Sequence, residues 1–293
     1  MIAKLVVIGV GLIGGSLACA LRKAGRVGAV IGVGRSIANL KQAVALGVID
    51  SYSQDGAQAV ADADMVVIGA TLGSTAAILE TIAPALQPAT IVTDVGSTKA
   101  SVVAAARLAL GDKFARFVPG HPIAGTEHSG AQAAFADLYV GHRVILTPVA
   151  ETDLDALARV RAMWECVGAR VTQMSVADHD RVLAATSHLP HMLAFTLVDM
   201  LAAADDADDI FAFAAGGFRD FTRIASSNPE MWRDIALANR DALLAICGSY
   251  KARLERLMQA LREGDGATLE QSFKRAKEAR DRCVVADANA PRQ

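Results

Sequence analysis

One histidine of the chain stands in a setting that suits proton transfer. His121 lies between a glycine and a proline in FVPGHPIAGTEHSG (117–130), directly after a short apolar run. The ordinary pKa of an imidazole lets it accept a proton near neutral pH. The alternative is a surface loop histidine, or one whose nitrogens are satisfied by backbone carbonyls. The surrounding pattern must decide between the two.

Three glycines near the N-terminus predict that the chain binds a dinucleotide. Gly9, Gly11 and Gly14 form G-x-G-x-x-G between a strand-like run, KLVVIGV, and a helix-like run rich in leucine and alanine. The first glycine permits the tight turn, the second lets the backbone approach a pyrophosphate, and the third lets helix pack on strand. The helix N-terminus, with Leu12 and Ile13, then faces the phosphates.

The end of the second expected strand favours NADP over NAD as the cofactor. About 20 residues after the last glycine, an NAD enzyme would place an acid on the ribose 2′-hydroxyl. This chain has Gly34 there, followed by Arg35 and Ser36, which can donate hydrogen bonds to a 2′-phosphate. In the alternative, Arg35 is a solvated loop residue and NAD binds without an acidic contact.

Strand-like and helical runs alternate through residues 1–174, which predicts an α/β Rossmann-type domain with a parallel sheet. Apolar runs at 63–70, 89–101 and 114–122 indicate buried strands, and runs at 143–149 and 169–175 extend the sheet to about Met174. Ligands bind at the carboxyl ends of such strands. We therefore expect Thr71, the segment 96–99 and His121 to lie on that edge, with Thr71 contacting the cofactor.

From Ser175 the pattern changes to long alanine- and leucine-rich helical segments, at roughly 177–204, 230–262 and 267–287. No strand pattern recurs. The acidic DDADD (205–209) is expected to be a solvated connection, and 214–235 to be a joint between helices. The sequence therefore predicts a dinucleotide-binding domain over 1–174 and an all-α domain over 175–293.

Composition argues against several kinds of partner. The 29 Lys and Arg against 31 Asp and Glu, a formal net charge of -2, offer no field to attract nucleic acid or an anionic membrane. Apolar stretches fall well short of the roughly 20 residues needed to cross a bilayer. Four scattered cysteines show no metal-ligand spacing, which indicates reduced thiols in a cytoplasmic protein.

Five segments together resemble the prephenate/arogenate (cyclohexadienyl) dehydrogenase family over nearly the whole chain. They are VIGVGLIGGS, DVGSTKAS, GHPIAGTEHSG, HDRVLAATSHLPH and GGFRDFTRIASSNPEMWRDI. Two departures from the family pattern stand out. Gly34 replaces the acid of NAD-using members, and GATLGSTAAIL (69–79) lacks the proline-containing turn that many members show.

The resemblance implies a reaction and a role for His121. Family members oxidise the ring carbon that bears the 4-hydroxyl of prephenate or arogenate, with loss of CO2 and aromatisation, in tyrosine biosynthesis. A hydroxyl whose carbon gives up hydride must also lose its proton, which His121 would accept. Ser97 would hydrogen-bond the imidazole or the 4-hydroxyl, although a serine at a strand end is often only a helix N-cap. Thr126 and Glu127 would line the same pocket, unless they form a simple polar turn.

The two carboxylates of such a substrate call for cationic partners. Arg223 is the leading candidate, with Arg219 in support on the same helical face. The alternative is an Arg223 that pairs with Asp220 on a solvated helix. By resemblance His191 and Trp232 line the substrate pocket, and the helical domain forms a homodimer. The alternative for Trp232 is core packing of an amphipathic helix, and the alternative for His188 and His179 is a buried, hydrogen-bonded structural role. No metal is expected, because sequence places no third ligand beside His188 and His191.

Two other kinds of protein would have the same dinucleotide-binding domain. A non-catalytic sensor would have no use for Ser97, His121 and Arg223 together. A β-hydroxyacid dehydrogenase or imine reductase would centre on a lysine in the helical domain, and the segments SHLPH and FTRIA have none.

Overall fold

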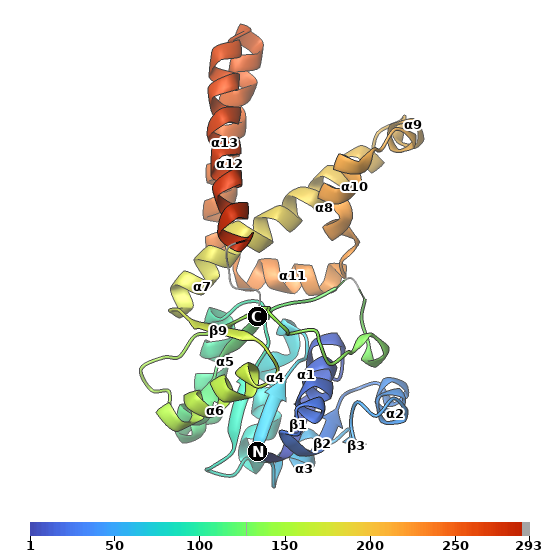
Figure 1. Ribbon diagram of the computed structural model, residues 1–293, viewed down its shortest axis with the longest axis vertical. Coiled ribbons are helices and arrows are strands. Elements are labelled where there is room, and N and C mark those ends of the chain that lie inside the picture. Colours follow the sequence, from blue (N-terminus) through green and yellow to red (C-terminus); the bar gives the residue numbers. More distant parts are fainter. Residues whose placement is uncertain (127, 289–293) are drawn as a thin grey trace. The chain divides into compact units, whose positions relative to one another are not determined.

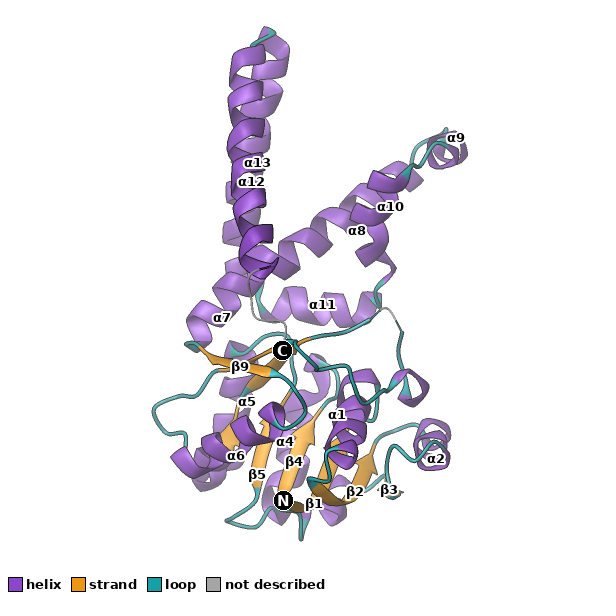
Figure 2. Ribbon diagram, viewed as in Figure 1, coloured by secondary structure: helices purple, strands orange, loops and turns teal. Residues whose placement is uncertain are grey.

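The computed structural model describes residues 1–126 and 128–288, and its helices and strands are drawn in Figures 1 and 2. The chain divides into two compact units, residues 1–240 and the residues that follow. Every described residue of the predicted site belongs to the first unit. The predicted domain boundary at 174/175 lies inside that unit and remains a prediction.

A six-stranded parallel sheet forms the centre of the first unit, in the order β3-β2-β1-β4-β5-β6. Its strands are β1 (Ile2–Ile8), β2 (Val27–Val33), β3 (Ser51–Ser53), β4 (Met65–Ile68), β5 (Ile91–Asp94) and β6 (Phe117–Val118). This strand order, with crossover helices, is that of the doubly wound dinucleotide-binding fold. The predicted fold class is confirmed.

Side chains of the strands alternate between two hydrophobic cores, as the two-residue period of a strand requires. Leu5 and Val7 of β1 face one core with α1 (Leu12–Lys23), α2 (Ile37–Ala45) and α6 (Leu154–Glu165). Val6 and Ile8 face the other core with three helices: α3 (Gly56–Val60), α4 (Thr75–Ile82) and α5 (Ala100–Leu110). Short 3₁₀ turns complete this part: η1 (Leu72–Ser74), η2 (Ala83–Ala85), η3 (Gly111–Arg116) and η4 (Ala131–Ala133).

The strand expected over 114–122 is divided between two sheets, which corrects the prediction of one sheet extending to Met174. Its first part, β6, ends at Val118, and β7 (Gly120–Ile123) begins after Pro119 in a three-stranded sheet with β8 (Arg143–Leu146) and β9 (Arg170–Gln173). β7 and β8 are antiparallel, whereas β8 and β9 are parallel. Proline cannot donate a ladder hydrogen bond, so it marks the change of sheet.

Helices follow β9, as predicted, but with more interruptions. The span expected at 177–204 is α7 (Val176–Leu183), a π-helical turn η5 (Ala184–His188) and α8 (Leu189–Ala202). The acidic connection partly forms α9 (Ala207–Ala212), because Asp208 and Asp209 occupy its first turn, where acids favour a helix. The joint holds α10 (Gly216–Thr222), η6 (Arg223–Ser226) and the start of α11 (Pro229–Ala238).

The span expected at 230–262 breaks at Asn239, between α11 and α12 (Arg240–Glu263). The last helix, α13 (Gly266–Ala288), follows a turn at Gly264. Within the described residues, no helix is both long enough and apolar enough to span a membrane.

Candidate active site

A cavity of about 1020 Å³ opens at the carboxyl ends of β1, β2 and β4. Its floor contains Gly9, Gly34 and Gly69, each of which directly follows one of these strands. Ile8 pairs with Val33 on one side and Ile68 on the other, and Ile68 pairs with Asp94. The ends of four strands are therefore in register, and the β5 end lies beside the cavity.

The glycines of the turn fit a bound dinucleotide. Gly9 has φ +95°, and a Cβ there would lie 2.6 Å from the Gly69 carbonyl oxygen. A Cβ on Gly14 would lie 2.6 Å from the Gly9 carbonyl oxygen, whereas one on Gly11 would meet no atom within 4 Å. Gly9 and Gly14 thus serve close packing, and Gly11 leaves open space. The N-cap of α1 is Gly11, which has no side chain to cap the helix, so the first amides of α1 are available to a phosphate.

The predicted cofactor residues do not all line this cavity. Gly9, Gly11, Gly34, Arg35, Ser36 and Thr71 line it, whereas Leu12, Ile13 and Gly14 do not. Leu12 and Gly14 are buried in the packing of α1. Sequence reasoning missed Asn39, whose side-chain amide donates to the Val10 carbonyl at 2.7 Å and so fixes the glycine turn.

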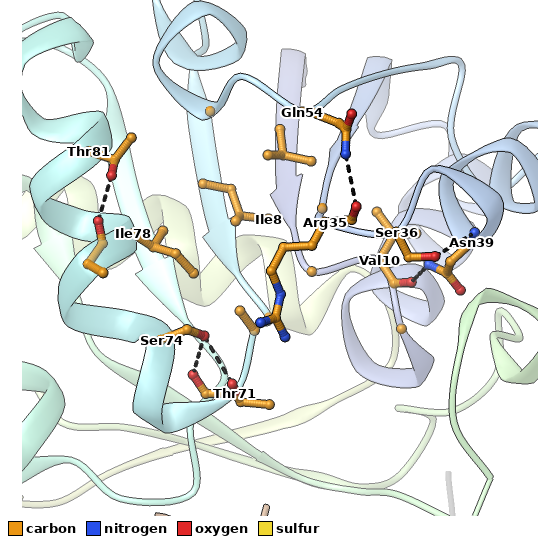
Figure 3. A pocket seen from close by; sticks show the side chains of 18 of the residues that line it. Ile8, Val10, Arg35, Ser36, Asn39, Gln54, Thr71, Ser74, Ile78 and Thr81 are labelled. Atoms are coloured by element: carbon orange, nitrogen blue, oxygen red, sulfur yellow. Dashed lines mark hydrogen bonds between the residues drawn. The ribbon is translucent and has the colours of Figure 1, made fainter.

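Arg35 extends into the cavity. Figure 3 shows its side chain reaching toward Thr71 and Ser74, and the Gln54 amide holds its carbonyl at 2.9 Å. No described carboxylate lies within ion-pair distance of the guanidinium, and no acidic side chain is among the described residues that line the cavity. The hydroxyl of Ser36 accepts a hydrogen bond from the Asn39 amide as the N-cap of α2, which leaves its proton for a ligand.

His121 lies in β7, beyond the end of β5, and it is buried. Its Nδ1 is 2.9 Å from Nε2 of His179, and Nδ1 of His179 is 2.7 Å from Oδ1 of Asp180. The pKa of His121 lies well below the ordinary 6.5, first because burial disfavours the charged ring and then because Lys99 is a nearby cation. The imidazole is therefore neutral across the neutral pH range.

A buried ion pair fixes the backbone just before His121. Lys99 is fully buried, and its Nζ donates to Asp94 Oδ2 at 2.5 Å and to the Gly120 carbonyl at 2.7 Å. The Gly120 amide donates to Asp94 Oδ1 at 3.1 Å. Both polar groups of Gly120 are thus held by one ion pair, which orients the next residue, His121.

Asp180 of α7 caps the N-terminus of α5. Its carboxylate oxygens accept from the Lys99 and Ala100 amides, each at 2.8 Å. These bonds and the one from His179 lower the pKa of Asp180, against the opposing effect of burial, which is the largest single influence. The cap comes from 80 residues away in the chain, so Ser97 is not the N-cap of α5.

Ser97 lies in the loop before α5, partly buried, and within the described residues its hydroxyl makes no hydrogen bond to His121. Its backbone lies near His188, where it raises the pKa of that ring by less than burial lowers it. The structure therefore brings Ser97 to the same site without joining it to the imidazole.

Two more histidines and Trp232 form an aromatic group. His191 stacks on Trp232 with ring centroids 3.6 Å apart, and His188 meets the same indole edge-on at 6.0 Å. The π-helical turn ends at His188, and the Asn239 amide donates to Nδ1 of that ring at 3.1 Å. The His188 Nε2 and Trp232 Nε1 donors are buried without a hydrogen bond among the described residues. In native proteins such buried donors are usually satisfied by an ordered water or a ligand.

The remaining candidates lie on exposed segments. Arg219 belongs to α10 and Arg223 starts η6, and the positive charge of Arg223 lowers the pKa of His191, after the larger effect of burial. Arg223 therefore lies near the aromatic group. Thr126 is exposed, and its hydroxyl accepts from the His128 amide at 3.2 Å, as in a polar turn. Glu127 lies outside the described residues.

Sequence reasoning gave no role to Asp94 or Asp180, placed Lys99 only within the segment 96–99 at the sheet edge, and left His179 as a possible structural residue. The motifs DVGSTKAS and HDRVLAATSHLPH contain all four residues. A lysine and an aspartate are ordinarily exposed, so a burial pattern gives no hint of them. Their pairing depends on contacts between segments far apart in the chain.

Two family models match the chain. One, described as prephenate dehydrogenase, nucleotide-binding domain, covers residues 17–173, and the other, the dimerization domain of the same family, covers 175–275. A cyclohexadienyl dehydrogenase of Zymomonas mobilis is 38% identical over 94% of each chain. A prephenate dehydrogenase of Bacillus subtilis is 37% identical over 93% of this chain and 74% of its own.

Solved structures agree with these relatives. Prephenate dehydrogenase from Aquifex aeolicus, in complex with hydroxyphenyl propionate and NAD+, superposes with a TM-score of 0.89 at 38% identity, covering 97% of this chain and 99% of that one. Synechocystis arogenate dehydrogenase gives a TM-score of 0.80 at 32% identity, with coverage of 95% and 99%.

Proposed function

The chain belongs to the prephenate dehydrogenase family, and on that premise we propose that it oxidises prephenate, arogenate or both. In this reaction the ring carbon bearing the 4-hydroxyl loses a hydride and its oxygen loses a proton. The bond to the ring carboxylate breaks, CO2 leaves, and the electron pair of that bond completes the aromatic ring. The product is 4-hydroxyphenylpyruvate from prephenate or tyrosine from arogenate.

The observation that carries the proposal is a neutral, buried His121 beyond the end of β5, the strand whose end lies beside a cavity with a dinucleotide-type glycine turn. His121 accepts the hydroxyl proton while hydride leaves the same carbon, so charge does not build up on the oxygen. The buried ion pair of Lys99 and Asp94 keeps the peptide before His121 fixed. Ser97, in the loop before α5, would hydrogen-bond the substrate hydroxyl and keep it in register with the ring.

Arg223, supported by Arg219, binds a substrate carboxylate. A clamp on the departing ring carboxylate would stabilise the ground state and raise the barrier to CO2 loss. The arginines therefore act on the side-chain carboxylate. The free donors of His188 and Trp232, together with His191, support binding of a polar ring substrate beside Arg223. Thr126 and Glu127 remain candidates for the rim of this pocket.

We assign NADP as the preferred cofactor, with NAD as the weaker one. A nicotinamide dinucleotide, when bound, supplies the hydride acceptor. The backbone at Gly11 and the first turn of α1, which includes Leu12 and Ile13, would hold its pyrophosphate. Gly9 and Gly14 would let the turn and the helix pack closely enough for that approach, and Thr71 lines the same cavity. Arg35 and Ser36 would hold a 2′-phosphate, and the absence of an acid among the described lining residues supports this choice.

The proposal also covers the oligomeric state of the protein and its location in the cell. The helical residues after 174, matched by a dimerization-domain model, form a homodimer. The expected cytoplasmic location accords with Cys19, Cys166 and Cys247 being free thiols. Family membership does not favour a non-catalytic sensor, a β-hydroxyacid dehydrogenase or an imine reductase.

Steady-state kinetics with prephenate and arogenate, each with NADP and NAD, test both parts of the proposal. Reduced cofactor should form with at least one substrate, and kcat/KM should be higher with NADP. Arg35→Ala should lower the NADP/NAD ratio of kcat/KM by one to two decades, since a charge-assisted contact is worth roughly 1.5–3 kcal/mol. Gly34→Asp, whose Cβ has only ordinary contacts with Leu40, should lower the ratio further by repulsion. A wild type that favours NAD would refute the cofactor assignment.

A further inference from the structure

Three side chains from two segments form a continuous hydrogen-bonded line, Asp180 to His179 to His121. His179 is fully buried and Asp180 is nearly so, and neither residue faces the dinucleotide cavity. The rings of His121 and His179 meet edge-on, with centroids 5.1 Å apart. The direction of the hydrogen bonds along this line follows from what each atom can do.

Asp180 can only accept. Its Oδ1 already receives the Lys99 amide and its Oδ2 the Ala100 amide, and a backbone amide is always a donor. The carboxylate also sits at the N-terminus of the 11-residue helix α5, which favours its ionised form. The third group on it, Nδ1 of His179, must therefore carry a hydrogen and donate.

When His179 is the neutral imidazole, it has one N–H, so its Nε2 is then an acceptor. The only hydrogen-bond partner of this nitrogen among the described residues is Nδ1 of His121, which must donate across 2.9 Å. His121 thus carries its hydrogen on Nδ1, and the lone pair on Nε2 remains for a ligand. The opposite tautomer carries its hydrogen on Nε2, so that nitrogen would have no lone pair with which to accept a proton.

We propose that His179 and Asp180 are positioning residues that hold His121 in the tautomer with a free Nε2, which is the atom that takes the substrate proton. The inference rests on the proposed function for its catalytic consequence, but the tautomer itself can be observed without substrate. When Nε2 gains the proton, the Asp180 carboxylate favours the new charge on His121 through His179, whereas the nearby Lys99 cation opposes it.

The test uses two substitutions at one position. His179→Gln retains an oxygen that can accept from Nδ1 of His121, whereas His179→Leu, of similar size, has no acceptor. Both substitutions break the link to Asp180, so a merely structural role of that link would affect both variants alike. Asp180→Asn is a third variant. Its side-chain amide can donate to Nδ1 of His179, which would reverse the direction of both hydrogen bonds between residue 180 and His121.

The readout is nitrogen NMR of the full-length protein with ¹⁵N-labelled histidine, in which His121→Asn identifies the His121 signals. In wild type and His179→Gln, Nδ1 of His121 should be protonated and Nε2 bare. His179→Leu and Asp180→Asn should populate the opposite tautomer and lower kcat by at least about tenfold with little change in substrate KM. His179→Gln should recover most of the kcat.

Two results would overturn the inference. One is a wild-type His121 protonated on Nε2. The other is a His179→Leu variant that keeps both the tautomer and the kcat of wild type. If the tautomer responds as expected but no substrate of the proposed class is turned over, the hydrogen-bonded line stands and the proposed function fails.

Discussion

Removal of the His121 imidazole should cost more turnover than any other single change at the site. Asparagine keeps a polar side chain of similar size but cannot accept a proton. His121→Asn should keep the fold and the cofactor affinity and lower kcat by roughly 10²–10⁴, the usual contribution of a general base. Stopped-flow turnover and a separate cofactor titration measure the two quantities. Turnover near that of wild type would remove His121 from the reaction.

Loss of Arg223, also a change of a single residue, should affect substrate binding more than turnover. Truncation to alanine leaves a desolvated substrate carboxylate without its partner, so Arg223→Ala should raise KM and cost about 2–5 kcal/mol in kcat/KM. Arg181→Ala provides the matched control, because Arg181 is an exposed arginine that pairs with Asp178 on α7. If kcat/KM changes equally little in both variants, the carboxylate is held by another residue.

At the scale of elements, two glycines between β1 and α1 have different roles. Gly14 allows close packing of the helix on the strand, and Gly11 leaves open space for a ligand. Gly14→Ala would force a Cβ to 2.7 Å from the Val7 side chain, so α1 must move and the protein should lose about 1–3 kcal/mol of stability. Gly11→Ala meets no neighbouring atom and should leave stability unchanged while weakening cofactor binding.

Thermal unfolding and cofactor titration of these two variants provide the comparison. Equal loss of stability in both variants would show that the two glycines do not differ in how closely they are packed. Loss of cofactor affinity in neither would show that the turn does not approach the pyrophosphate.

Elements with a local pattern could be predicted from the sequence, and those that depend on distant contacts could not. The glycine turn, the existence of strands β1 and β4, and the helical character after Ser175 follow from periodicity and glycine spacing. The division of the strand at Pro119 was missed because the apolar run continues on both sides of the proline. The cap that Asp180 places on α5 has no local signal, since it joins α5 to a helix 80 residues later.

The same contrast holds within the site. His121, His191, Arg223 and Trp232 were selected because their motifs resemble a family. Lys99 was not, because a fully buried lysine depends on an aspartate and a carbonyl that only the fold brings to it.

The molecule as a whole should be less stable in mild acid. Burial lowers the pKa of His188 to about 4 and also lowers those of His121 and His191 from 6.5. Between pH 6.5 and 4 the unfolded chain therefore binds more protons at these positions than the folded chain does. The free energy of unfolding therefore falls as the pH falls through this window, by about 3 kcal/mol for His188 alone.

Urea unfolding at several pH values measures this dependence, and His188→Gln should flatten it. The pKa of Asp180 is lowered from its ordinary 3.8, so its effect on stability falls at more acidic pH. It therefore does not obscure the effect of the histidines between pH 6.5 and pH 4. A free energy of unfolding that stays constant from pH 6.5 to pH 4 would contradict neutral, buried histidines.

The central claim is that hydride leaves the hydroxyl-bearing ring carbon while CO2 leaves the opposite one. Prephenate and arogenate carrying deuterium on the hydroxyl-bearing carbon test it most directly, with mass spectrometry of the nicotinamide and collection of CO2. We predict that, with at least one of them, the deuterium is recovered in the reduced nicotinamide, with one CO2 and one aromatic product for each cofactor reduced. Reduced cofactor without deuterium, or formed without CO2, would contradict the account, as would no reduction with either substrate by a protein that is folded and binds its cofactor.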